Sequence, residues 1–417
     1  MIKKKCQMAR EASKTLALAS PESKQAALLL IAELLWSKRD EILDANAEDV
    51  QNAKASGISG SMLDRLTLDE NRIADVVNDL RSVAKLPDPV GETYDESILP
   101  NGLRIHKRRV PLGVLAVIYE ARPNVTVDIT CLALKSGNAV ILRGGSETMA
   151  TNSILVAVIH EALCAFGLPD NVVQFIDSPD RALVAELLKM YEYVDMLIPR
   201  GGAALHKFCR ENSMIPVITG GIGICHLYVA KSADLAAALS VIQNAKVQRP
   251  TVCNALDTVL LDRAVAVQVI PPLVEKLSGD GVTFRMDDGS LAIYGTEDEH
   301  VKKASSQDFD QEWLSLILGI KVVAGLDEAI QHISDHSTGH SDGILTEDED
   351  EARQFLQRVD SAAVYVNAST RFTDGAQLGM GAEVAISTQR LHARGPMALK
   401  ELTTYKWIIE GNYHVRP

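Results

Sequence analysis

Two apolar runs with a helical pattern between them make up the stretch Val114-Leu-Ala-Val-Ile-Tyr-Glu-Ala-Arg-Pro-Asn-Val-Thr-Val-Asp-Ile-Thr-Cys-Leu-Ala-Leu-Lys-Ser-Gly-Asn-Ala-Val-Ile-Leu142. The runs Val114–Tyr119 and Ala139–Leu142 are short and continuous, as in strands that are buried on both faces of a parallel sheet. Residues Val125–Lys135 between them predict a helix. A strand, a helix and a strand form a βαβ unit, in which the strands lie parallel and the crossover is right-handed.

The same alternation of strand and helix patterns continues along the chain in two sets. In the first set, further strands are expected at 172–176, 194–198 and 215–218, and further helices at 147–166, 181–190 and 203–210. The second set begins near residue 233 and has strands expected at 256–261, 317–323, 343–345 and 362–366, with helices at 233–246, 263–277, 327–335 and 350–358. We therefore predict an α/β fold with two three-layer α/β/α domains in series.

The segments outside these two sets have different patterns. Residues 7–84 are helical, and Ser20 begins one of these helices as a cap before a proline. Residues 90–113 predict a hairpin that turns at Asn101-Gly102. The basic run Arg104–Arg109 in this hairpin fits either a charged edge strand or an anion-binding site. The polar tail after residue 366 is expected to fold back onto other parts of the chain.

The composition limits the classes of function. With 417 residues, of which 47% are hydrophobic and 23% charged, the chain is long enough for about two to three folded domains. Its formal net charge of −13 disfavours nucleic acid as a partner. Six cysteines without a CxxC pair indicate a reducing compartment. The start of the chain shows no secretory signal and the apolar runs stop short of the ~20 residues of a membrane span, so we expect a cytoplasmic protein without a membrane partner.

A cysteine in a short loop is the first candidate for chemistry. It lies in the segment Asn244-Ala-Lys-Val-Gln-Arg-Pro-Thr-Val-Cys253-Asn-Ala-Leu-Asp257, between a predicted helix and a predicted strand. Pro250 ends the helix, because it lacks an N–H group and its ring clashes with the preceding turn. A loop between two rigid elements suits a nucleophile, whereas a buried cysteine is more often a small hydrophobic residue. From this segment alone both interpretations stay open.

Two glycine-rich turns each follow a predicted strand and open a predicted helix. Backbone N–H groups at a helix start favour anions, and glycines let a phosphate come close. An arginine in each turn could pair with phosphate through two N–H donors. Neither turn matches G-x-G-x-x-G, and each could be an ordinary strand–helix connection, but together they favour a nucleotide cofactor. Their residues are Arg143, Gly144, Gly145 and Ser146 in the first turn, and Arg200, Gly201 and Gly202 in the second.

The loop after the first strand carries Arg122, Pro123 and Asn124. Asn124 could cap the helix that follows, or its amide could donate a hydrogen bond to a developing oxyanion. Three histidines, His332, His336 and His340, are spaced four apart. Glycine breaks the helix before the third of them and no ligand set completes a tetrahedral site, so we predict no metal site.

These motifs, in this order, resemble the aldehyde dehydrogenase superfamily, and the resemblance covers essentially the whole chain. Within the superfamily the chain is similar to the branch that reduces L-glutamate 5-phosphate to L-glutamate 5-semialdehyde in proline biosynthesis. The stretches that carry the similarity are Arg108-Arg-Val-Pro-Leu-Gly-Val114, Ile118-Tyr-Glu-Ala-Arg-Pro-Asn-Val-Thr126, Asp195-Met-Leu-Ile-Pro-Arg-Gly-Gly202, Gln248-Arg-Pro-Thr-Val-Cys-Asn254 and Tyr365-Val-Asn-Ala-Ser-Thr-Arg-Phe-Thr-Asp-Gly375.

The resemblance implies an aldehyde dehydrogenase-like fold with two Rossmann-related domains and a small oligomerisation element. An NADP-binding domain would comprise residues 1–89 and 114–230, and a catalytic domain residues 231–394. The hairpin 90–113 and a C-terminal strand within 395–417 would build a homodimer or homotetramer. The kinase that makes the substrate would be a separate protein, and a complex with this glutamate 5-kinase is left open.

The resemblance also implies a mechanism. The Cys253 thiolate would attack the acyl phosphate and form a thioester, Asn124 would stabilise the oxyanion, and NADPH would supply hydride. Besides the two glycine-rich turns, Gly220 and Glu312 are candidates for cofactor binding. Ser146 and Arg143 favour NADP over NAD without settling the choice. For substrate binding the candidates are Arg122, Arg371 and Asp374, which could equally form structural ion pairs.

One departure from the wider superfamily is informative. Oxidative members carry a glutamate just before a glycine pair, and it activates the water that hydrolyses the thioester; here Val217-Ile-Thr-Gly-Gly221 has no carboxylate. Without a general base the thioester would wait for hydride. Two alternatives remain from the sequence: another acylating, CoA-dependent aldehyde dehydrogenase, and a non-catalytic α/β protein.

Overall fold

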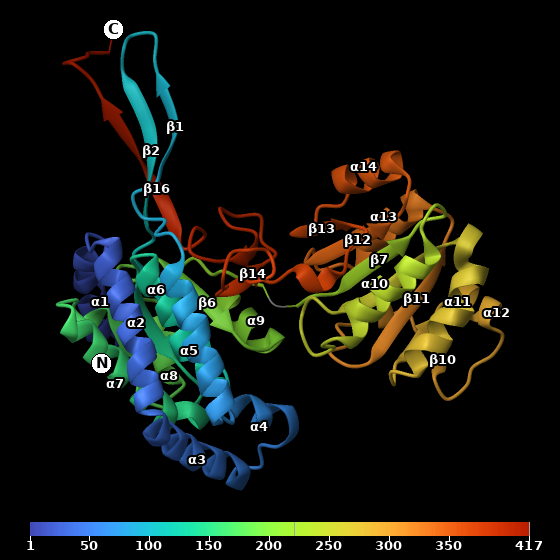
Figure 1. Cartoon of the computed structure of the whole chain (residues 1–417), viewed down its shortest axis with the longest axis horizontal. Coiled ribbons are helices and arrows are strands. Elements are labelled where there is room, and N and C mark those ends of the chain that lie inside the picture. The colour runs from blue at the N-terminus through green and yellow to red at the C-terminus, as the bar shows by residue number, and fades with distance from the viewer. Residues whose placement is uncertain (221, 417) are drawn as a thin grey trace. The chain divides into compact units, whose positions relative to one another are not determined.

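The computed structural model describes residues 1–220 and 222–416, so Gly221 and Pro417 lie outside the described residues. The chain forms two compact units, each of which is described by itself below (Figure 1). Unit 1 comprises Met1–Thr219, Gly379–Ala385 and Met397–Pro417, and unit 2 comprises Gly220–Leu378 and Ile386–Pro396. The assignment of cofactor binding to one domain and catalysis to the other stays a prediction.

Unit 1 is built on a four-stranded parallel sheet in the order β5-β4-β3-β6. Its strands are β3 (Val114–Tyr119), β4 (Ala139–Arg143), β5 (Val173–Phe175) and β6 (Met196–Arg200). Every residue of β3 is buried, and Ala116 at its centre pairs with Ile141 on one side and Leu197 on the other. The βαβ unit predicted from residues 114–142 is therefore confirmed.

The predicted strand at 215–218 is wrong. Only Val217 forms an isolated bridge, parallel to Leu197 of β6. Pro216 has no N–H to donate to a ladder, and a glycine at position 220 follows, so the segment cannot continue as a regular strand.

Helices cover this sheet, and they pack largely on one another. The α2 helix packs against α5, α6 and α7, and α1 packs against β4. Ser20 caps α2 as predicted, because its Oγ accepts the N–H of Ser23 at 3.1 Å and proline occupies the first helical position. The helices of unit 1 are α1 (Ile2–Leu16), α2 (Pro21–Ser37), α3 (Arg39–Ala55), α4 (Gly60–Leu66), α5 (Glu70–Lys85), α6 (Asn124–Lys135), α7 (Met149–Ala165), α8 (Ala182–Leu187) and α9 (Ala203–Asn212).

One helical stretch of the described residues, Ser146–Ala165, is long and apolar enough to cross a membrane by length and composition alone. The apolar runs were expected to be shorter than this. Half of the stretch is buried inside the protein, and the core helix of a globular domain meets the same criteria.

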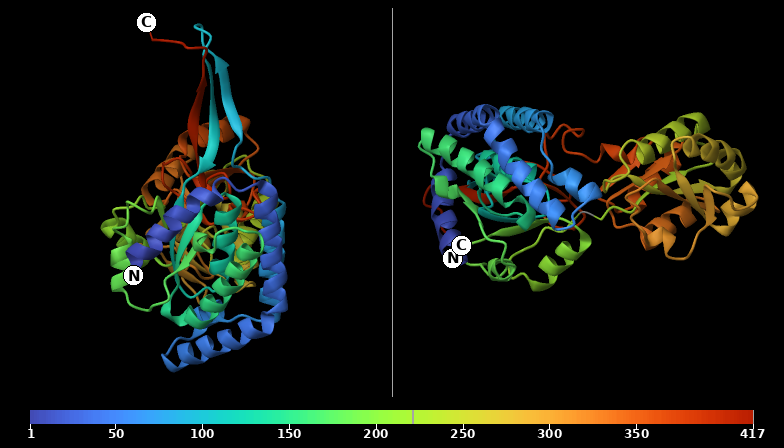
Figure 2. Two further views of the ribbon diagram at one scale, coloured as in Figure 1. Left: turned by 90° about the vertical axis from the view of Figure 1, so that its left-hand side faces the viewer. Right: turned by 90° about the horizontal axis from the view of Figure 1, so that it is seen from below.

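The hairpin predicted at 90–113 belongs to a small antiparallel sheet, which extends away from the helices of unit 1 (Figure 2). Its strands are β1 (Thr93–Ile98), β2 (Arg104–Pro111) and β16 (Thr403–Glu410). The basic strand β2 lies in the middle, so its interpretation as an edge strand is wrong. Lys107 Nζ lies over the rings of Tyr405 and Trp407, at 4.6 and 5.1 Å from their centroids.

Unit 2 is built on a seven-stranded sheet in the order β10-β9-β11-β8-β7-β12-β13, and every pair in it is parallel. Its strands are β7 (Cys225–Val229), β8 (Leu256–Asp262), β9 (Thr283–Met286), β10 (Val301–Lys303), β11 (Ile317–Val323), β12 (Ser341–Leu345) and β13 (Ala363–Val366). The helices are α10 (Leu235–Val247), α11 (Arg263–Ser278), α12 (Asp288–Tyr294), α13 (Leu326–His336) and α14 (Glu349–Arg358). The strands and helices of the second predicted set are confirmed, and the structure adds β7, β9, β10 and α12, which the sequence analysis missed.

Asn138 joins three parts of unit 1 and is fully buried. It accepts the N–H of Gly113 before β3 at 2.8 Å and donates to the carbonyl of Leu402 before β16 at 2.8 Å. Its position after α6 and before β4 lets one side chain fix where the small sheet leaves the domain.

Replacing Asn138 by Ala is expected to lower the free energy of unfolding by about 2–4 kcal/mol, because the buried N–H of Gly113 and carbonyl of Leu402 lose their partner. Thermal unfolding followed by circular dichroism measures the effect. The matched control is Asn78→Ala, which removes an exposed carboxamide from α5. Equal midpoints for the two variants would contradict this role of Asn138.

Candidate active site

Cys253 lies in the loop 248–255 between α10 and β8, as predicted, and it is half-buried. The structure describes all six cysteines, and none of them is in a disulfide. The fold therefore presents the Cys253 thiol on a short connection between two packed elements.

The backbone of Gly223 packs directly against Cys253. A Cβ atom at position 223 would lie 1.6 Å from the carbonyl oxygen of Cys253, so only glycine fits there. The thiol of Cys225 donates to the same carbonyl at 3.3 Å, and the N–H of Gly223 donates to Glu312 Oε1 at 2.9 Å. These contacts place the cysteine loop, the segment before β7 and Glu312 in one packed group.

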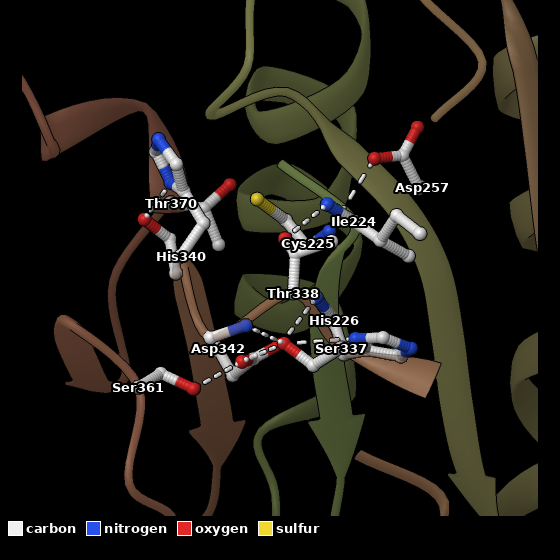
Figure 3. A network of polar contacts seen from close by, with 12 residues as sticks. Ile224, Cys225, His226, Asp257, Ser337, Thr338, His340, Asp342, Ser361 and Thr370 are labelled. Carbon is white, nitrogen blue, oxygen red and sulfur yellow. Dashed lines mark hydrogen bonds and ion pairs between the residues drawn. The ribbon is translucent and has the colours of Figure 1, made fainter. Parts of the chain in front are cut away.

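Two buried carboxylates fix the start of β7, one from each neighbouring strand (Figure 3). Asp257 of β8 accepts the N–H of Cys225 at 3.3 Å, and Asp342 of β12 accepts the N–H of His226 at 2.9 Å. Asp342 also accepts from the ring Nδ1 of His226 at 2.9 Å. The register of the strand that carries Cys225 is thus set by side chains in addition to the ladder.

Hydroxyl groups complete this network (Figure 3). Ser337 and Ser361 both donate to Asp342 Oδ2, the former at 2.6 Å. Thr338 accepts the N–H of Ile224 at 3.1 Å and donates to the carbonyl of Ile222 at 2.7 Å. The segment that packs on Cys253 is therefore held on its other side by the residues just before β12.

Burial shifts the titration of several groups around the cysteine loop. It raises the pKa of Asp257 to about 6, against the opposing charge of Lys246. It lowers the pKa of Lys246 to about 8, and the Lys246 ammonium lies 3.8 Å from Asp257 and donates to the carbonyl of Leu256 at 2.9 Å. Burial also raises the pKa of Glu312 to about 6 and that of the Cys225 thiol well above its usual value. Cys225 therefore stays protonated and keeps its S–H donor.

Asn254, next to Cys253, ties the cysteine loop to the segment 370–373. Its Nδ2 donates to the carbonyl of Thr373 at 2.9 Å, and its own carbonyl accepts from the Thr370 hydroxyl at 2.7 Å. Its Oδ1 accepts from Arg371 Nη1. Asn254 is 4% exposed, so these bonds are shielded from water.

The predicted substrate residues lie in different settings. Arg371 is half-buried and contacts the cysteine loop through Asn254. Asp374 Oδ1 accepts the N–H groups of Ala376 and Gln377, at 2.9 and 3.1 Å, so this carboxylate has a turn-forming role. Arg122 is exposed in the loop after β3, in unit 1.

Asn124 does not cap its helix. It is the first residue of α6, the N-cap position is Pro123, and no side chain caps that end. Asn124 does not cap the helix because its side chain binds elsewhere: its Nδ2 donates to Asp128 Oδ2, one turn later in α6, at 2.9 Å. Burial raises the pKa of Asp128 to about 7, against the hydrogen bond from Asn124. The capping interpretation is wrong, and the role of Asn124 in catalysis stays a prediction.

The first glycine-rich turn is packed tightly. Arg143 is 7% exposed, and its guanidinium donates to the carbonyls of Gly144 and Pro179. A Cβ at Gly144 would lie 2.3 Å from the Asn152 amide, and one at Gly145 would lie 2.1 Å from a carboxylate oxygen of Glu147. Close packing therefore also requires glycine at both positions, whatever their role in binding a cofactor. Ser146, which follows them, is exposed.

The second glycine-rich turn opens α9, whose first residue is Ala203. Gly201 and Gly202 are exposed, and the N–H of Gly202 donates to Glu120 Oε2 at 3.0 Å. Arg200, the last residue of β6, is half-buried. Glu147 plays a similar part near the first turn, where Oε1 accepts the N–H of Ala121 at 2.8 Å. The predicted phosphate turns are therefore lined with carboxylates.

Gly220 has a packing role that its sequence does not reveal. A Cβ at this position would lie 1.7 Å from the carbonyl oxygen of Ile386, and the two segments meet at a bridge between Gly220 and Ser387. Its role in cofactor binding, like that of Glu312, stays a prediction.

Of the three spaced histidines, His332 and His336 contact aromatic and histidine rings, and His340 Nδ1 lies 2.8 Å from the Ser341 hydroxyl. The His332 ring lies 5.4 Å from that of His226 and 5.2 Å from that of Phe309, and burial lowers the pKa of His332 to about 2. His336 Nδ1 lies 2.7 Å from Asp310. Over residues 1–220 and 222–416 we find no group of three or more His, Cys, Asp or Glu side chains arranged as metal ligands.

Comparison with known proteins gives the family. The sequence profile described as "Aldehyde dehydrogenase family" matches residues 1–290, which is more than half of the chain. The chain belongs to the aldehyde dehydrogenase family. Members of this family are oxidoreductases that use nicotinamide cofactors, and the resemblance described above is confirmed.

Similarity to individual aldehyde dehydrogenase family proteins extends over the whole chain. A gamma-glutamyl phosphate reductase of Psychromonas ingrahamii is 58% identical over 98% of this chain and 98% of its own. The crystal structure of a gamma-glutamyl phosphate reductase from Thermotoga maritima superposes with a TM-score of 0.97 at 47% identity and covers 100% of both chains. An engineered glycolyl-CoA reductase with bound NADP+ has a TM-score of 0.67 at 18% identity, covers 98% of this chain and 96% of that one, and shares the fold. The predicted aldehyde dehydrogenase-like fold is thus confirmed.

Several site residues were missed from the sequence. Gly223, Cys225, Asn254 and Asp257 act through contacts with segments distant in sequence, and no motif marks them. Asn254 could have been found from its position beside Cys253, because a polar residue next to a nucleophile in a tight loop needs partners of its own.

Replacing Gly223 by Ala is expected to lower kcat by about 100-fold or more, because the new methyl group must displace the Cys253 carbonyl and with it the thiol. The measurement is steady-state dehydrogenase activity of the purified variant, with circular dichroism to show that it is folded. Gly279→Ala in unit 2 is the matched control, since its Cβ would lie 3.3 Å from the nearest atom. Full activity in Gly223→Ala would show that the position of this carbonyl is irrelevant to turnover.

Proposed function

We propose that this protein catalyses the NADPH-dependent reduction of L-glutamate 5-phosphate to L-glutamate 5-semialdehyde, with release of phosphate. This reaction is the second step of proline biosynthesis from glutamate. The observation that carries the proposal is the thiol of Cys253 on a loop held by Gly223, Cys225 and Asn254, in a chain that is 58% identical to a named gamma-glutamyl phosphate reductase.

Cys253 is the proposed nucleophile. Its thiolate attacks the acyl carbon of the substrate, the bond to the phosphate oxygen breaks, and inorganic phosphate leaves with the electron pair. A thioester on Cys253 remains. A thiolate suits both halves of the reaction, since it is a strong nucleophile and also a good leaving group. When the semialdehyde departs, the thiol is regenerated.

Asn124 is the proposed donor to the oxyanion that forms at the acyl oxygen. One amide hydrogen of its Nδ2 is used by Asp128, which fixes the orientation of the carboxamide. The second amide hydrogen can then serve the substrate. Such a donor is oriented before the reaction and costs little reorganisation in the transition state.

NADPH, when bound, supplies the hydride that reduces the thioester. The turn at 200–202 is proposed to hold an anionic group, because Gly201 and Gly202 are exposed and the helix α9 begins directly after them. The N–H of Gly202, which donates to Glu120 Oε2, would then exchange this carboxylate for the phosphate. In the first turn the exposed Ser146 leaves room for a phosphate. The residues proposed to hold the cofactor are Arg143, Gly144, Gly145, Ser146, Arg200, Gly201, Gly202, Gly220 and Glu312.

Hydrolysis of the thioester is slow because the stretch that carries the general base in oxidative members of the family carries none in this chain. The described residues of the stretch 217–223 contain no carboxylate. Hydrolysis is therefore slow relative to reduction, which suits an enzyme that transfers the acyl group to hydride.

Substrate recognition is assigned to charged side chains. L-glutamate 5-phosphate carries a phosphate, an α-carboxylate and an α-amine, so a chain of net charge −13 needs local cations to bind it. We assign Arg122 and Arg371 to the anionic groups and Asp374 to the amine.

We also propose an oligomeric state, a cellular location and a source of the substrate. The small sheet β1-β2-β16 exposes Tyr405, Trp407 and Ile409, of which 46%, 51% and 63% are accessible, and this apolar face suits a homodimer or homotetramer. A cytoplasmic location agrees with the absence of disulfides among the six cysteines. A separate glutamate 5-kinase supplies the substrate.

The reverse reaction separates this function from a CoA-dependent one. NADP+ reduction with glutamate semialdehyde is expected to require inorganic phosphate, since phosphate must release the acyl group from Cys253. The measurement is NADPH formation with phosphate, with CoA, and with neither. Activity that depends on CoA and ignores phosphate would overturn the proposed substrate.

The same assay with Cys253→Ser tests the covalent mechanism, and we expect kcat to fall by at least about 1,000-fold. Cys164→Ser, at an exposed cysteine of α7, is the matched control and should retain activity. Unchanged turnover in Cys253→Ser would exclude the thioester and favour a non-cysteine mechanism.

Asn124→Ala is expected to lower kcat by about 100- to 1,000-fold, or ~3–4 kcal/mol, with a smaller change in KM, because the lost donor acts on the transition state. The kinetic constants of the reverse reaction measure this. Asn52→Ala, at an exposed asparagine of α3, controls for the loss of a carboxamide. A rise in KM alone would reassign Asn124 to substrate binding.

A further inference from the structure

Arg371 bridges the two ends of the cysteine loop. Its Nε donates to Gln248 Oε1 at 3.1 Å, and its Nη1 donates to Asn254 Oδ1. Gln248 is the first residue of this loop, and Asn254, beside Cys253, is the next to last. One guanidinium group therefore spans the connection that carries the thiol.

The position of Arg371 is itself fixed by the fold. It lies in the short 3-10 turn Thr370–Phe372 between β13 and the rest of unit 2, and its N–H donates to the hydroxyl of Ser369 at 3.3 Å. Asn254 binds the same turn through the carbonyl of Thr373 and the hydroxyl of Thr370. The arginine and the loop are held to each other by bonds from both sides, which restricts the guanidinium to a small region.

We propose that Arg371 is a positioning residue for Cys253: it fixes both ends of the cysteine loop and places a permanent positive charge that favours the thiolate. The proposal rests on the function proposed above, since it takes Cys253 as the nucleophile. It adds to the substrate-binding role of Arg371 a role that exists before any substrate binds.

The electrostatic surroundings support this role. Burial lowers the pKa of Arg371, as does neighbouring Arg249, while Cys253 and Asp374 oppose that decrease. Because Arg371 Nη1 is bound to Asn254, the residue next to Cys253, its charge lies beside the cysteine, and a cation near a thiol stabilises the ionised form of the thiol. Guanidinium keeps its proton at any pH relevant to the enzyme, so this stabilisation is constant.

Most of the other titratable groups around the loop are uncharged, hydrogen-bonded or ion-paired. Asp374 caps a turn, and Asp257 of β8 accepts two backbone N–H groups and faces Lys246 of α10. From β7, Cys225 contributes a protonated thiol. Two further charges remain: Glu312, bound to the N–H of Gly223, and Arg249 within the loop.

The rate at which iodoacetamide alkylates Cys253, measured against pH in the absence of substrate and cofactor, tests the proposal. Iodoacetamide is uncharged, so its rate follows the thiolate fraction, and peptide mass spectrometry separates Cys253 from the other cysteines. In Arg371→Met the midpoint of the pH profile is expected to rise by about one pH unit, because the nearby positive charge is lost. Arg353→Met, which removes an exposed arginine paired with Asp350 on α14, is the matched control and should leave the midpoint unchanged.

Two more variants make the outcome decisive. Arg371→Lys keeps the charge but cannot make both bonds, so we expect a smaller shift than in Arg371→Met. Gln248→Leu removes one bond and keeps the guanidinium; if Arg371→Met does not fold, a rise in the midpoint for Gln248→Leu supports the proposal and an unchanged midpoint overturns it.

An unchanged midpoint in a folded Arg371→Met variant overturns the proposal, even if KM for the substrate rises. That pattern would leave Arg371 as a substrate ligand only. The proposed reaction is tested separately, by the phosphate requirement and by Cys253→Ser, so the failure of one inference is distinguishable from the failure of the other.

Discussion

The close approach of the Gly223 backbone to the Cys253 carbonyl is the constraint on which the candidate site depends. A side chain at position 223 would separate the two segments by the width of a methyl group, since its Cβ would lie only 1.6 Å from the oxygen. With glycine there, one carbonyl accepts the Cys225 thiol and one N–H reaches Glu312. The backbone of Cys253, the thiol of Cys225 and the carboxylate of Glu312 are thereby packed as one group.

Buried carboxylates on the two strands that flank β7 maintain this packing. Asp257 of β8 and Asp342 of β12 accept hydrogen bonds from the N–H groups of Cys225 and His226, which are successive residues of β7. Side-chain carboxylates therefore supplement the backbone ladder at the start of this parallel strand. Their burial is costly unless every oxygen is satisfied, and hydroxyls, backbone N–H groups and Lys246 supply the partners. The hydrogen bonds of Asp257 and Asp342 leave few other arrangements for the segments that pack on Cys253.

The sequence predicts those strands, helices and site residues that a local pattern marks. The strand β3 was evident because all six residues are apolar and buried, whereas β9 and β10 were missed because they are short and only partly apolar. Cys253 was found from its loop and from the resemblance. Asn254 was not, because its partners lie 117 and 119 residues away in the sequence. The contact of Glu120 with the second glycine-rich turn was missed, and the direction of Glu147 beside the first turn stayed open, because a turn that binds an external anion and a turn that binds a carboxylate of its own chain have similar sequences.

The central place of β2 in the small sheet has a consequence for biosynthesis of the chain. One edge of β2 pairs with β1, a few residues before it, but the other pairs with β16, and the side chains of Arg109 and Thr403 that meet there are 294 residues apart. A nascent chain on the ribosome holds β2 with an open edge until residues 403–410 have been synthesised. The β1–β2 hairpin can form early, whereas the three-stranded sheet closes only when β16 has left the exit tunnel. A protein truncated before residue 403 would carry this aggregation-prone edge permanently.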